Sequence, residues 1–225
     1  MNRAVITDHS TVELVQSNIS DDMVAMSAWI SNGLNTEDRL AEPGRKDGLI
    51  NFLVREKHLS PLEHGSMTLK VQTPLFVRSE WHRHRVQSFN ERSLRYSKFK
   101  GEIYVPGPLR PVVQSGKIGA YQFEHDDALN AVIRHRMERK ADADLDEYYE
   151  LLDLGAAPEV ARMVLSVSCM TEFYATANLR NWLQFLDLRQ SDQALYEIRQ
   201  AAHDVAAILE QQAPLTVGAW NTYRS

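Results

Sequence analysis

The sequence predicts a protein of the α+β class. Segments with helical periodicity outnumber segments that alternate like strands, and the strand candidates lie in both halves of the chain instead of repeating regularly between helices. No internal repeat and no Gly-, Ser- or Pro-rich linker interrupts the 225 residues. We therefore expect a single domain over residues 1–225.

The first half of the chain should contain both strands and helices. Residues 4–17 place apolar side chains around a polar turn and predict an opening hairpin. A helix should begin after Ser20, whose hydroxyl precedes two aspartates, and should end at Gly33. Residues 45–57 carry apolar positions on one helical side, and residues 67–71 alternate like a strand.

A helix that Pro74 opens should lead into the second half of the chain. Its apolar side carries Trp81. Residues 101–114 contain three prolines and two glycines and predict an ordered loop. The elements expected after this loop are a long helix over residues 121–154, a short helix near Pro158, a strand over residues 168–178, and helices over residues 179–187 and 193–211.

The overall composition excludes several classes of protein. The chain carries 25 Lys and Arg against 30 Asp and Glu, and this formal net charge of −5 excludes a globally basic nucleic-acid binder. No window approaches about 18 consecutive apolar residues, and the N-terminal residues lack the apolar stretch of a signal peptide. The single Cys169 allows neither an intramolecular disulfide nor a cysteine-built metal site. We therefore expect a cytoplasmic protein without a membrane-spanning helix.

Positive charge is concentrated in residues 78–100. These 23 residues hold seven basic and two acidic side chains, whereas the rest of the chain holds 18 basic and 28 acidic side chains. Such a run of basic residues is often a solvated surface, or it interacts with the negative C-terminal end of a helix dipole. Here Trp81, Phe89, Leu94 and Tyr96 lie between the charges and should anchor the segment to a core. Half-buried arginines need anionic partners, which either the acidic remainder of the chain or a bound ligand would supply.

Two patterns in this segment favour a ligand. Residues 83–85, Arg-His-Arg, close the expected helix, and because consecutive helical side chains diverge by about 100°, they would line a groove between two ligands or two subunits. Glu91, Ser93 and Arg95 are spaced two residues apart, so an extended backbone would present all three on one side. A carboxylate, a hydroxyl and a forked guanidinium suit a phosphorylated, hydroxylated small molecule such as a nucleotide.

Metal-dependent and covalent chemistry have less support. The pairs His58 with His64 and His82 with His84 lack the spacing of helical metal-binding motifs, so we expect no metal site. Cys169 lies among apolar residues and should be a buried thiol, not a nucleophile. Neither a G-x-G-x-x-G motif nor a Walker A loop is present, so a nucleotide would be held by side chains and irregular backbone.

Four polar residues in the second half are further candidates. Arg162, Arg180 and Arg189 are embedded in apolar sequence, and each either pairs with a nearby acid or contacts a ligand. Asn178 follows the strand expected over residues 168–178, and it either caps the next helix or contacts a ligand.

Several motifs of the chain recur together in one known family. The string Arg-His-Arg-Val-Gln-Ser-Phe-Asn-Glu-Arg-Ser-Leu-Arg-Tyr over residues 83–96 resembles the central motif of the flavin-dependent thymidylate synthases nearly end to end. The other segments that are similar to this family, in the same order, are residues 61–64, 74–77, 159–162, 178–180 and 187–189. The resemblance covers roughly residues 10–210.

The resemblance implies both a fold and an activity. The implied fold is an α+β domain with a central, mostly antiparallel sheet and packed helices, in a homotetramer that binds its ligands at subunit interfaces. The implied enzyme is a methyltransferase that makes dTMP from dUMP, with FAD as cofactor, 5,10-methylenetetrahydrofolate as one-carbon donor and NADPH as reductant. Because flavin and folate supply the chemistry, no enzyme cysteine nucleophile is needed. Neither nucleic acid nor a membrane is an expected partner.

The resemblance also implies a role for individual residues. Arg189 is the implied catalytic residue, placed beside the uracil ring where it favours the ionised N3. Ser93 and Arg95 would address the phosphate, and Arg162 would reach dUMP from another subunit. The residues implied to contact FAD are His58, Ser60, Arg83, His84, Arg85, Glu91, Asn178, Leu179, Arg180 and Gln184. The residues implied to contact dUMP are Glu80, Trp81, His82, Arg83, Glu91, Arg92, Ser93, Leu94, Arg95, Arg162 and Arg189.

Two other functions are compatible with the same motifs. A nucleotide sensor that kept the dUMP-binding residues would bind dUMP without turning it over. A nucleic-acid-binding module would use residues 78–100 as a basic patch with interleaved aromatic residues, and its affinity would fall steeply with salt.

Overall fold

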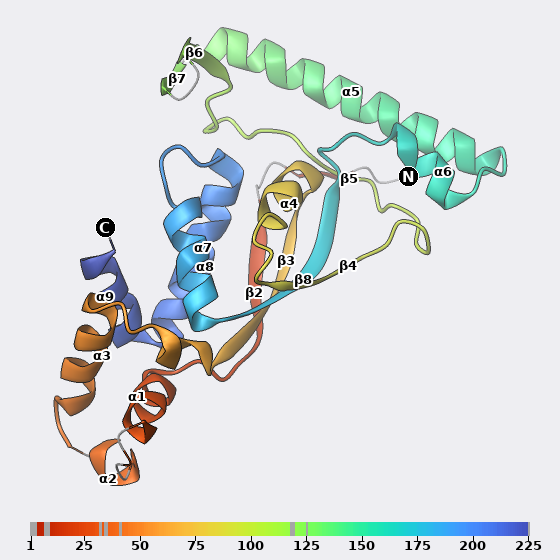
Figure 1. Cartoon of the computed structure of the whole chain (residues 1–225). Helices are drawn as coiled ribbons and strands as arrows, with labels where there is room; N and C mark the ends of the chain where they lie inside the picture. The colour runs from red at the N-terminus through yellow and green to blue at the C-terminus, as the bar shows by residue number, and fades with distance from the viewer. Residues whose placement is uncertain are drawn as a thin grey trace. The chain divides into compact units, whose positions relative to one another are not determined.

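The protein is described by a computed structural model that covers residues 4–6, 10–31, 33, 36–40, 42–117, 120–124 and 126–224 (Figure 1). Its chain divides into two compact units, each built from segments that are distant in sequence. Unit 1 comprises Met1–Ser10, Gln72–Trp81 and Glu91–Glu172. Unit 2 comprises Thr11–Val71, His82–Asn90 and Phe173–Ser225.

A four-stranded sheet has the strand order β2-β3-β8-β4. Its strands are β2 (Thr11–Ser17), β3 (Ser66–Pro74), β8 (Met170–Asn178) and β4 (Ser88–Glu91). The chain directions of β3 and β8 follow from hydrogen bonds at their ends: Leu75 N–H donates to the Cys169 carbonyl at 3.0 Å, and Leu179 N–H donates to the Gly65 carbonyl at 3.2 Å. Because residue numbers rise on one strand as they fall on the other, the pair is antiparallel. The predicted α+β class with an antiparallel sheet is confirmed.

Helices make up much of unit 2. They are α1 (Asp21–Ile30), α2 (Thr36–Leu40), α3 (Arg45–Arg55), the 3₁₀ helix η1 (Ser60–Glu63), α7 (Leu179–Arg189), α8 (Tyr196–Gln212) and α9 (Pro214–Tyr223). In this unit α3 packs against α9, and α7 packs against α8 (Figure 1). Trp182, Phe185 and Leu183 are fully buried, so α7 is central to the core of the unit.

A buried aspartate connects the two ends of unit 2. Asp21 accepts hydrogen bonds from the backbone N–H of Leu215 at 2.9 Å, from the N–H of Thr216 at 2.9 Å and from the Thr216 hydroxyl at 2.7 Å. The first N–H groups of a helix have no partner within the helix, and a carboxylate also suits the positive end of the helix dipole. Asp21 therefore caps α9 although it lies 194 residues away in sequence.

Unit 1 combines short strands with one long helix. Its elements are β1 (Ala4–Ile6), α4 (Leu75–Trp81), β5 (Glu102–Tyr104), β6 (Val113–Lys117), β7 (Ala120–Glu124), α5 (Asp127–Asp153), α6 (Pro158–Ala161) and the 3₁₀ helix η2 (Arg162–Val164). The strands β1 and β5 are parallel, whereas β6 and β7 form an antiparallel hairpin. Tyr148 of α5 is fully buried, and its hydroxyl accepts a hydrogen bond from the Phe99 N–H at 3.0 Å.

Several expectations from the sequence are confirmed. The Ser20 hydroxyl accepts a hydrogen bond from the Met23 N–H at 3.1 Å and so caps α1. Asn178 caps α7 by accepting from the Asn181 N–H at 2.9 Å. Gly33 has the positive φ, 66°, expected after a helix end.

Other expectations were wrong. Residues 4–17 do not form a hairpin, because β1 pairs with β5 and β2 belongs to the four-stranded sheet; residues 7–9 lie outside the described part of the chain. The expected loop over residues 101–114 contains β5 and the start of β6. The long helix begins at Asp127 and not at residue 121, because Asp126 caps it by accepting from the Leu129 N–H and β7 precedes it. No helix was expected over the residues that form α9. No helix among the described residues is long and apolar enough to cross a membrane.

Candidate active site

A pocket of about 650 Å³ lies within unit 1. Its walls include the end of β4, the residues that follow it, and residues of η2 and β8. Five of the residues predicted to contact dUMP line it: Glu91, Arg92, Ser93, Leu94 and Arg162. The fold therefore brings together two predicted segments that are about 70 residues apart in sequence.

Glu91 is fixed at the edge of this pocket. Its Oε1 accepts hydrogen bonds from Arg78 Nε at 3.1 Å and from the Thr171 hydroxyl at 2.7 Å. Both Arg78 and Glu91 are only partly exposed, so the pair is better ordered than a surface ion pair. Because the two bonds use Oε1, Glu91 presents an oriented carboxylate to the pocket.

Two arginines of the pocket carry charge that no described acidic side chain neutralises. Arg92 Nε donates to the Ser97 hydroxyl at 3.4 Å, and Arg162 Nε donates to the Glu159 backbone carbonyl at 3.3 Å. Neither guanidinium forms an ion pair with a carboxylate within the described ranges. Ser93 adds a hydroxyl to the same pocket. Two unneutralised guanidinium groups beside a hydroxyl are suited to a phosphate.

Arg95 does not line this pocket. Residues 92–97 leave the strand and include a turn, so the extended backbone expected over Glu91, Ser93 and Arg95 ends at Glu91. The Arg95 side chain lies on the exposed surface, where Nε donates to Glu159 Oε2 at 3.0 Å. Its backbone N–H donates to the Ser93 hydroxyl at 3.2 Å.

Residues 80–85 are placed differently from the helical arrangement expected. The helix α4 ends at Trp81, which is fully buried, and Glu80 is half-buried in its last turn. Residues 83–85 therefore lie in a turn, and the expectation that they close a helix was wrong. His82 packs its ring on Phe89 at a centroid distance of 4.2 Å.

The Arg-His-Arg motif exposes its two arginines and buries its histidine. Arg83 and Arg85 are exposed, and their guanidinium groups have no hydrogen-bond or ion-pair partner in the described part of the chain. His84 is 8% exposed, packs edge-on against Phe185 at 4.8 Å, and accepts a hydrogen bond from Arg189. In this hydrogen bond, Arg189 Nε donates to His84 Nε2 at 2.8 Å. The catalytic candidate and a flavin candidate are therefore in direct contact.

The other predicted flavin residues, apart from Glu91, also lie in unit 2. Asn178 and Leu179 begin α7, where Leu179 is buried and Asn178 is the cap. Arg180 forms an ion pair with Glu63. His58 packs edge-on against Phe52 at 5.7 Å, and Ser60 is an exposed residue of η1. Arg83 and Arg85, which have no partner among the described residues, fit the phosphates of a flavin dinucleotide. The amides and hydroxyls among the predicted flavin residues fit the polar edge of its ring.

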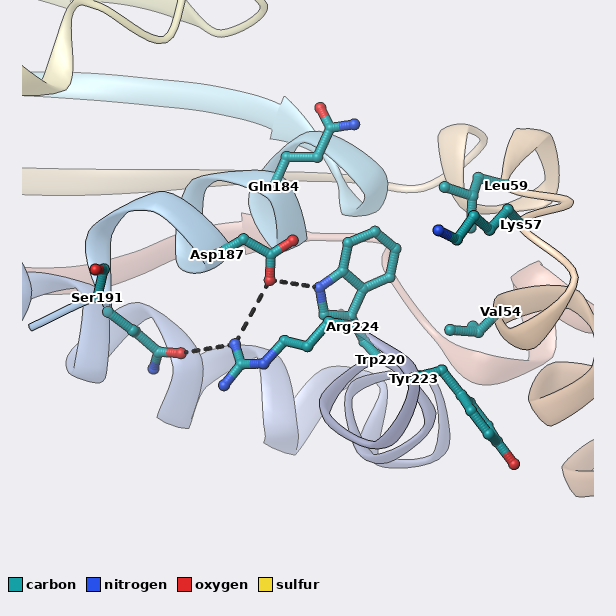
Figure 2. A pocket seen from close by; sticks show the side chains of 10 residues that line it. Val54, Lys57, Leu59, Gln184, Asp187, Ser191, Trp220, Tyr223 and Arg224 are labelled. Carbon is teal, nitrogen blue, oxygen red and sulfur yellow. Dashed lines mark hydrogen bonds and ion pairs between the residues drawn. The ribbon is translucent and has the colours of Figure 1, made fainter.

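A second pocket, of about 590 Å³, lies within unit 2 (Figure 2). Gln184 is the one predicted flavin residue that lines it. The sequence analysis did not identify its charged members Lys57, Asp187 and Arg224 as ligand-binding residues. The sequence carried no local signal for this role, because Lys57 was the last residue of the helix expected over residues 45–57, whereas α3 ends at Arg55.

Cys169 belongs to the core of unit 1. Its side chain is fully buried in an apolar cluster with Ile103 and Tyr148. Burial raises the pKa of the Cys169 thiol to about 12. Because the thiolate is the nucleophilic form, this cysteine is unreactive near neutral pH. Among the described residues, no group of three or more His, Cys, Asp or Glu side chains is placed to hold a metal ion.

Comparison with known proteins identifies the family. The family model described as "Thymidylate synthase complementing protein" matches residues 13–215. The flavin-dependent thymidylate synthase of Streptomyces avermitilis is 39% identical over 223 residues, which covers 94% of this chain and 91% of that protein. The chain belongs to the flavin-dependent thymidylate synthase family. The family assignment expected from the sequence motifs is therefore confirmed.

Other relatives agree with this assignment. The flavin-dependent thymidylate synthase of Thermosipho africanus is 35% identical over 215 residues, covering 96% of this chain and 92% of the relative. Among solved structures, the UMP/dUMP methylase PolB from Streptomyces cacaoi, bound with 5-Br dUMP, has a TM-score of 0.89 and 36% sequence identity, and the match covers 97% of both chains. A structure of PolB with 5-Br UMP gives a TM-score of 0.88.

Proposed function

We propose that the protein is a thymidylate synthase that converts dUMP to dTMP by reductive methylation. The one-carbon donor is 5,10-methylenetetrahydrofolate and the reductant is NADPH. The observation that carries the proposal is the unit 1 pocket in which Arg92, Ser93 and Arg162 converge, because a nucleoside monophosphate needs such a set of cations and a hydroxyl. The family membership makes the reaction a methyl transfer to uracil.

The phosphate end of dUMP is held in this proposal by arginines. Arg92 and Arg162 bind the phosphate oxygens, and Ser93 donates its hydroxyl proton to one of them. Arg95 is also assigned to the phosphate, and it would have to leave Glu159 to reach it. Glu91, held by Arg78 and Thr171, orients the sugar or the base through its carboxylate.

The base end of dUMP is assigned to Arg189. A guanidinium beside the uracil ring stabilises negative charge on N3 and O4, and so favours the ionised ring that reacts at C5. His84 holds Nε of Arg189 in place, and Phe185 packs on the His84 ring. Glu80, Trp81, His82, Arg83 and Leu94 complete the proposed dUMP contacts.

The proposed flavin site keeps the residues that the family resemblance assigns to it, Glu91 among them. Arg83 and Arg85 bind the phosphates of FAD, and His58, Ser60, His84, Asn178, Leu179, Arg180 and Gln184 surround the rest of the molecule. When bound, FAD supplies hydride transfer, which no amino-acid side chain provides. The protein's own part is to position the ligands and to stabilise charge, so the reaction proceeds without a cysteine nucleophile. The pKa of about 12 at Cys169 supports this.

The proposal extends to the assembly and the location of the protein. The whole chain acts as one thymidylate synthase domain, and four copies form a homotetramer whose sites lie at subunit interfaces. The family resemblance assigns Arg162 to the dUMP site of another subunit, whereas the phosphate site proposed here takes Arg162 from the same copy as Arg92 and Ser93. The protein is cytoplasmic, and neither nucleic acid nor a membrane is a partner. Light scattering on the purified protein tests the assembly, because a monomer would contradict the shared site.

One experiment tests the activity directly. The purified protein is examined for the absorbance bands of flavin, and NADPH oxidation is then measured with methylenetetrahydrofolate in the presence and absence of dUMP. Formation of dTMP that requires dUMP and FAD is the expected result. Binding of dUMP without turnover would instead identify a nucleotide sensor. A parallel assay with UMP is worth including because PolB is named as a UMP/dUMP methylase.

A further inference from the structure

The second pocket has the properties of a small-molecule site. Its volume of about 590 Å³ lies within the range of ligand pockets in proteins. The end of α3, the segment before η1, α7 and α9 contribute its walls (Figure 2). Leu59 and Trp220 give it apolar and aromatic surface, whereas Lys57, Asp187 and Arg224 give it charge.

Lys57 is held in an unfavourable backbone conformation. Among the residues that the structure describes, it is the one non-glycine residue with a positive φ, at 57°. The Lys57 N–H donates to the Val54 carbonyl at 3.1 Å, and the His58 N–H donates to the Leu53 carbonyl at 2.8 Å. This pair of bonds is the Schellman motif that ends α3, and glycine is the usual residue at the position of Lys57. Glycine would remove the strain, so a lysine at this position points to a use for its side chain.

The Lys57 ammonium is the available charge of the pocket. No described residue forms a hydrogen bond or an ion pair with it. In Figure 2 its amino end points toward the side of the pocket on which Trp220 lies. A charged group that lines a concave pocket without a partner in the protein is available to a ligand of opposite charge.

The other charged groups of the pocket neutralise one another. Asp187 Oδ1 accepts from Trp220 Nε1 at 2.8 Å and lies 3.5 Å from Arg224 Nη1, which also donates to Gln190 Oε1 at 3.2 Å (Figure 2). These bonds fix the Trp220 ring as one wall. Lys57, Arg224 and Asp187 together leave one net positive charge. One available cation beside an aromatic wall suits an aromatic carboxylate better than a dinucleotide with several phosphates.

We propose that this pocket binds the p-aminobenzoyl-glutamate tail of the folate donor, with the benzoyl ring against Trp220 and a glutamate carboxylate on Lys57. The inference rests on the proposed function, because the folate donor is part of it. Gln184 lines this pocket and is also assigned to the flavin. A donor whose one-carbon unit reaches the flavin can therefore place its tail in this pocket.

The test uses p-aminobenzoyl-glutamate as the probe and the full-length protein supplied with FAD. Lys57→Gly removes the cation and the backbone strain together, and Lys57→Gln removes the charge while keeping most of the side chain. Both variants should bind the probe about tenfold more weakly than the wild type, the size of effect expected for a charged hydrogen bond. Lys57→Gly should at the same time raise the melting temperature by about 2–4 °C, because glycine carries no left-handed penalty. A lysine with only a structural role would not show this opposite pair of effects.

Three controls accompany the titration. Lys117→Gln removes an exposed lysine of the β6–β7 hairpin and should leave probe binding unchanged. The fragment p-aminobenzamide, which keeps the aromatic amide but carries no carboxylate, should bind the wild type and both Lys57 variants with equal affinity. NADPH affinity should also be unaffected by the Lys57 substitutions.

Three outcomes would overturn the inference: wild-type protein that shows no saturable binding of the probe, Lys57 variants that bind it normally, or a loss of affinity confined to NADPH. Failure of the proposed function is distinguishable from this. A protein that forms dTMP but binds the probe independently of Lys57 refutes the pocket assignment alone. A protein that forms no dTMP but binds the probe through Lys57 retains the pocket and loses the proposed reaction.

Discussion

Arg189 and His84 are joined by a hydrogen bond of 2.8 Å from the arginine Nε to the histidine Nε2. Because Nε2 accepts, the ring proton of His84 is on Nδ1. His84 is almost completely buried, and its ring packs against Phe185 of the same helix that carries Arg189. The arginine is thus anchored through Nε by a residue of the Arg-His-Arg motif. This contact joins the two sequence motifs that the proposed function assigns to uracil and to flavin.

Arg189→Ala should lower turnover more than it lowers flavin content. Removal of a group that stabilises developing charge costs about 2.7–4 kcal/mol of transition-state stabilisation, or roughly 100- to 1,000-fold in kcat. FAD content, measured by absorbance after purification, should stay close to that of the wild type. Normal turnover in this variant would refute the catalytic assignment.

His84→Ala provides the matching test of positioning. If His84 acts by holding Arg189, its loss should lower kcat while leaving dUMP affinity within about threefold of the wild type. His84→Gln, whose side-chain oxygen can accept a hydrogen bond, should recover part of the activity. Equal losses in His84→Ala and His84→Gln would argue against positioning through this bond.

Arg162→Ala should weaken dUMP binding by about 1.5–3 kcal/mol, the range for hydrogen bonds to charged groups. Its guanidinium lines the unit 1 pocket without a carboxylate partner among the described residues, so the loss should appear in binding itself. Titration with dUMP and with deoxyuridine separates the two ends of the ligand, because deoxyuridine has no phosphate. The substitution should affect dUMP alone.

Arg95→Ala is the companion variant. Arg95 should show the same selective loss of dUMP affinity if it leaves Glu159 on binding. Arg139→Ala, on the exposed side of α5, serves as a control for the loss of one positive charge. Unchanged dUMP affinity in Arg95→Ala would remove this residue from the phosphate site.

Features that depend on neighbouring residues in the sequence were predictable. The caps of α1 and α7 each use a side chain three residues before the N–H that it accepts from, so Ser20 and Asn178 carry their own local signal. The family motifs likewise identified which residues belong to a site. They could not show that Arg95 turns to Glu159, because the turn over residues 94–96 depends on the packing of the segment.

Features that depend on distant contacts were not predictable. The helix α9 is capped by Asp21 and carries no capping side chain of its own, so the one local signal for its start is Pro214 at its first position. The unit 2 pocket needs α9 against α3 and α7, and its existence could not be inferred from any one segment. The contact of Arg189 with His84 spans 105 residues. Each of these relationships is a property of tertiary packing.

Asp21→Ala should lower the free energy of unfolding by about 2–3 kcal/mol, since it removes hydrogen bonds to a carboxylate and leaves the N–H groups of Leu215 and Thr216 without a partner. Urea denaturation measures the loss. Asp22→Ala, which removes an exposed carboxylate paired with Lys46, should cost less than about 1 kcal/mol. Similar losses in the two variants would contradict a capping role for Asp21.

Cys169 provides a test of the cysteine-independent reaction and of its own burial. In the folded state the pKa of the Cys169 thiol is about 12, above its ordinary value of 9.0. Between these two pH values the folded protein keeps the thiol proton, whereas the unfolded chain has lost it. The contribution of the protonated thiol to stability is complete below pH 9.0 and is lost as the pH rises toward 12, and the cysteine therefore contributes to alkaline unfolding.

A thiol-specific reagent should leave native Cys169 unmodified at pH 8 and should react with it after unfolding in urea. Cys169→Ala should retain kcat, with a loss of stability of about 1 kcal/mol from the smaller buried side chain. Loss of turnover in a folded Cys169→Ala variant would require a nucleophile that the proposed reaction does not contain.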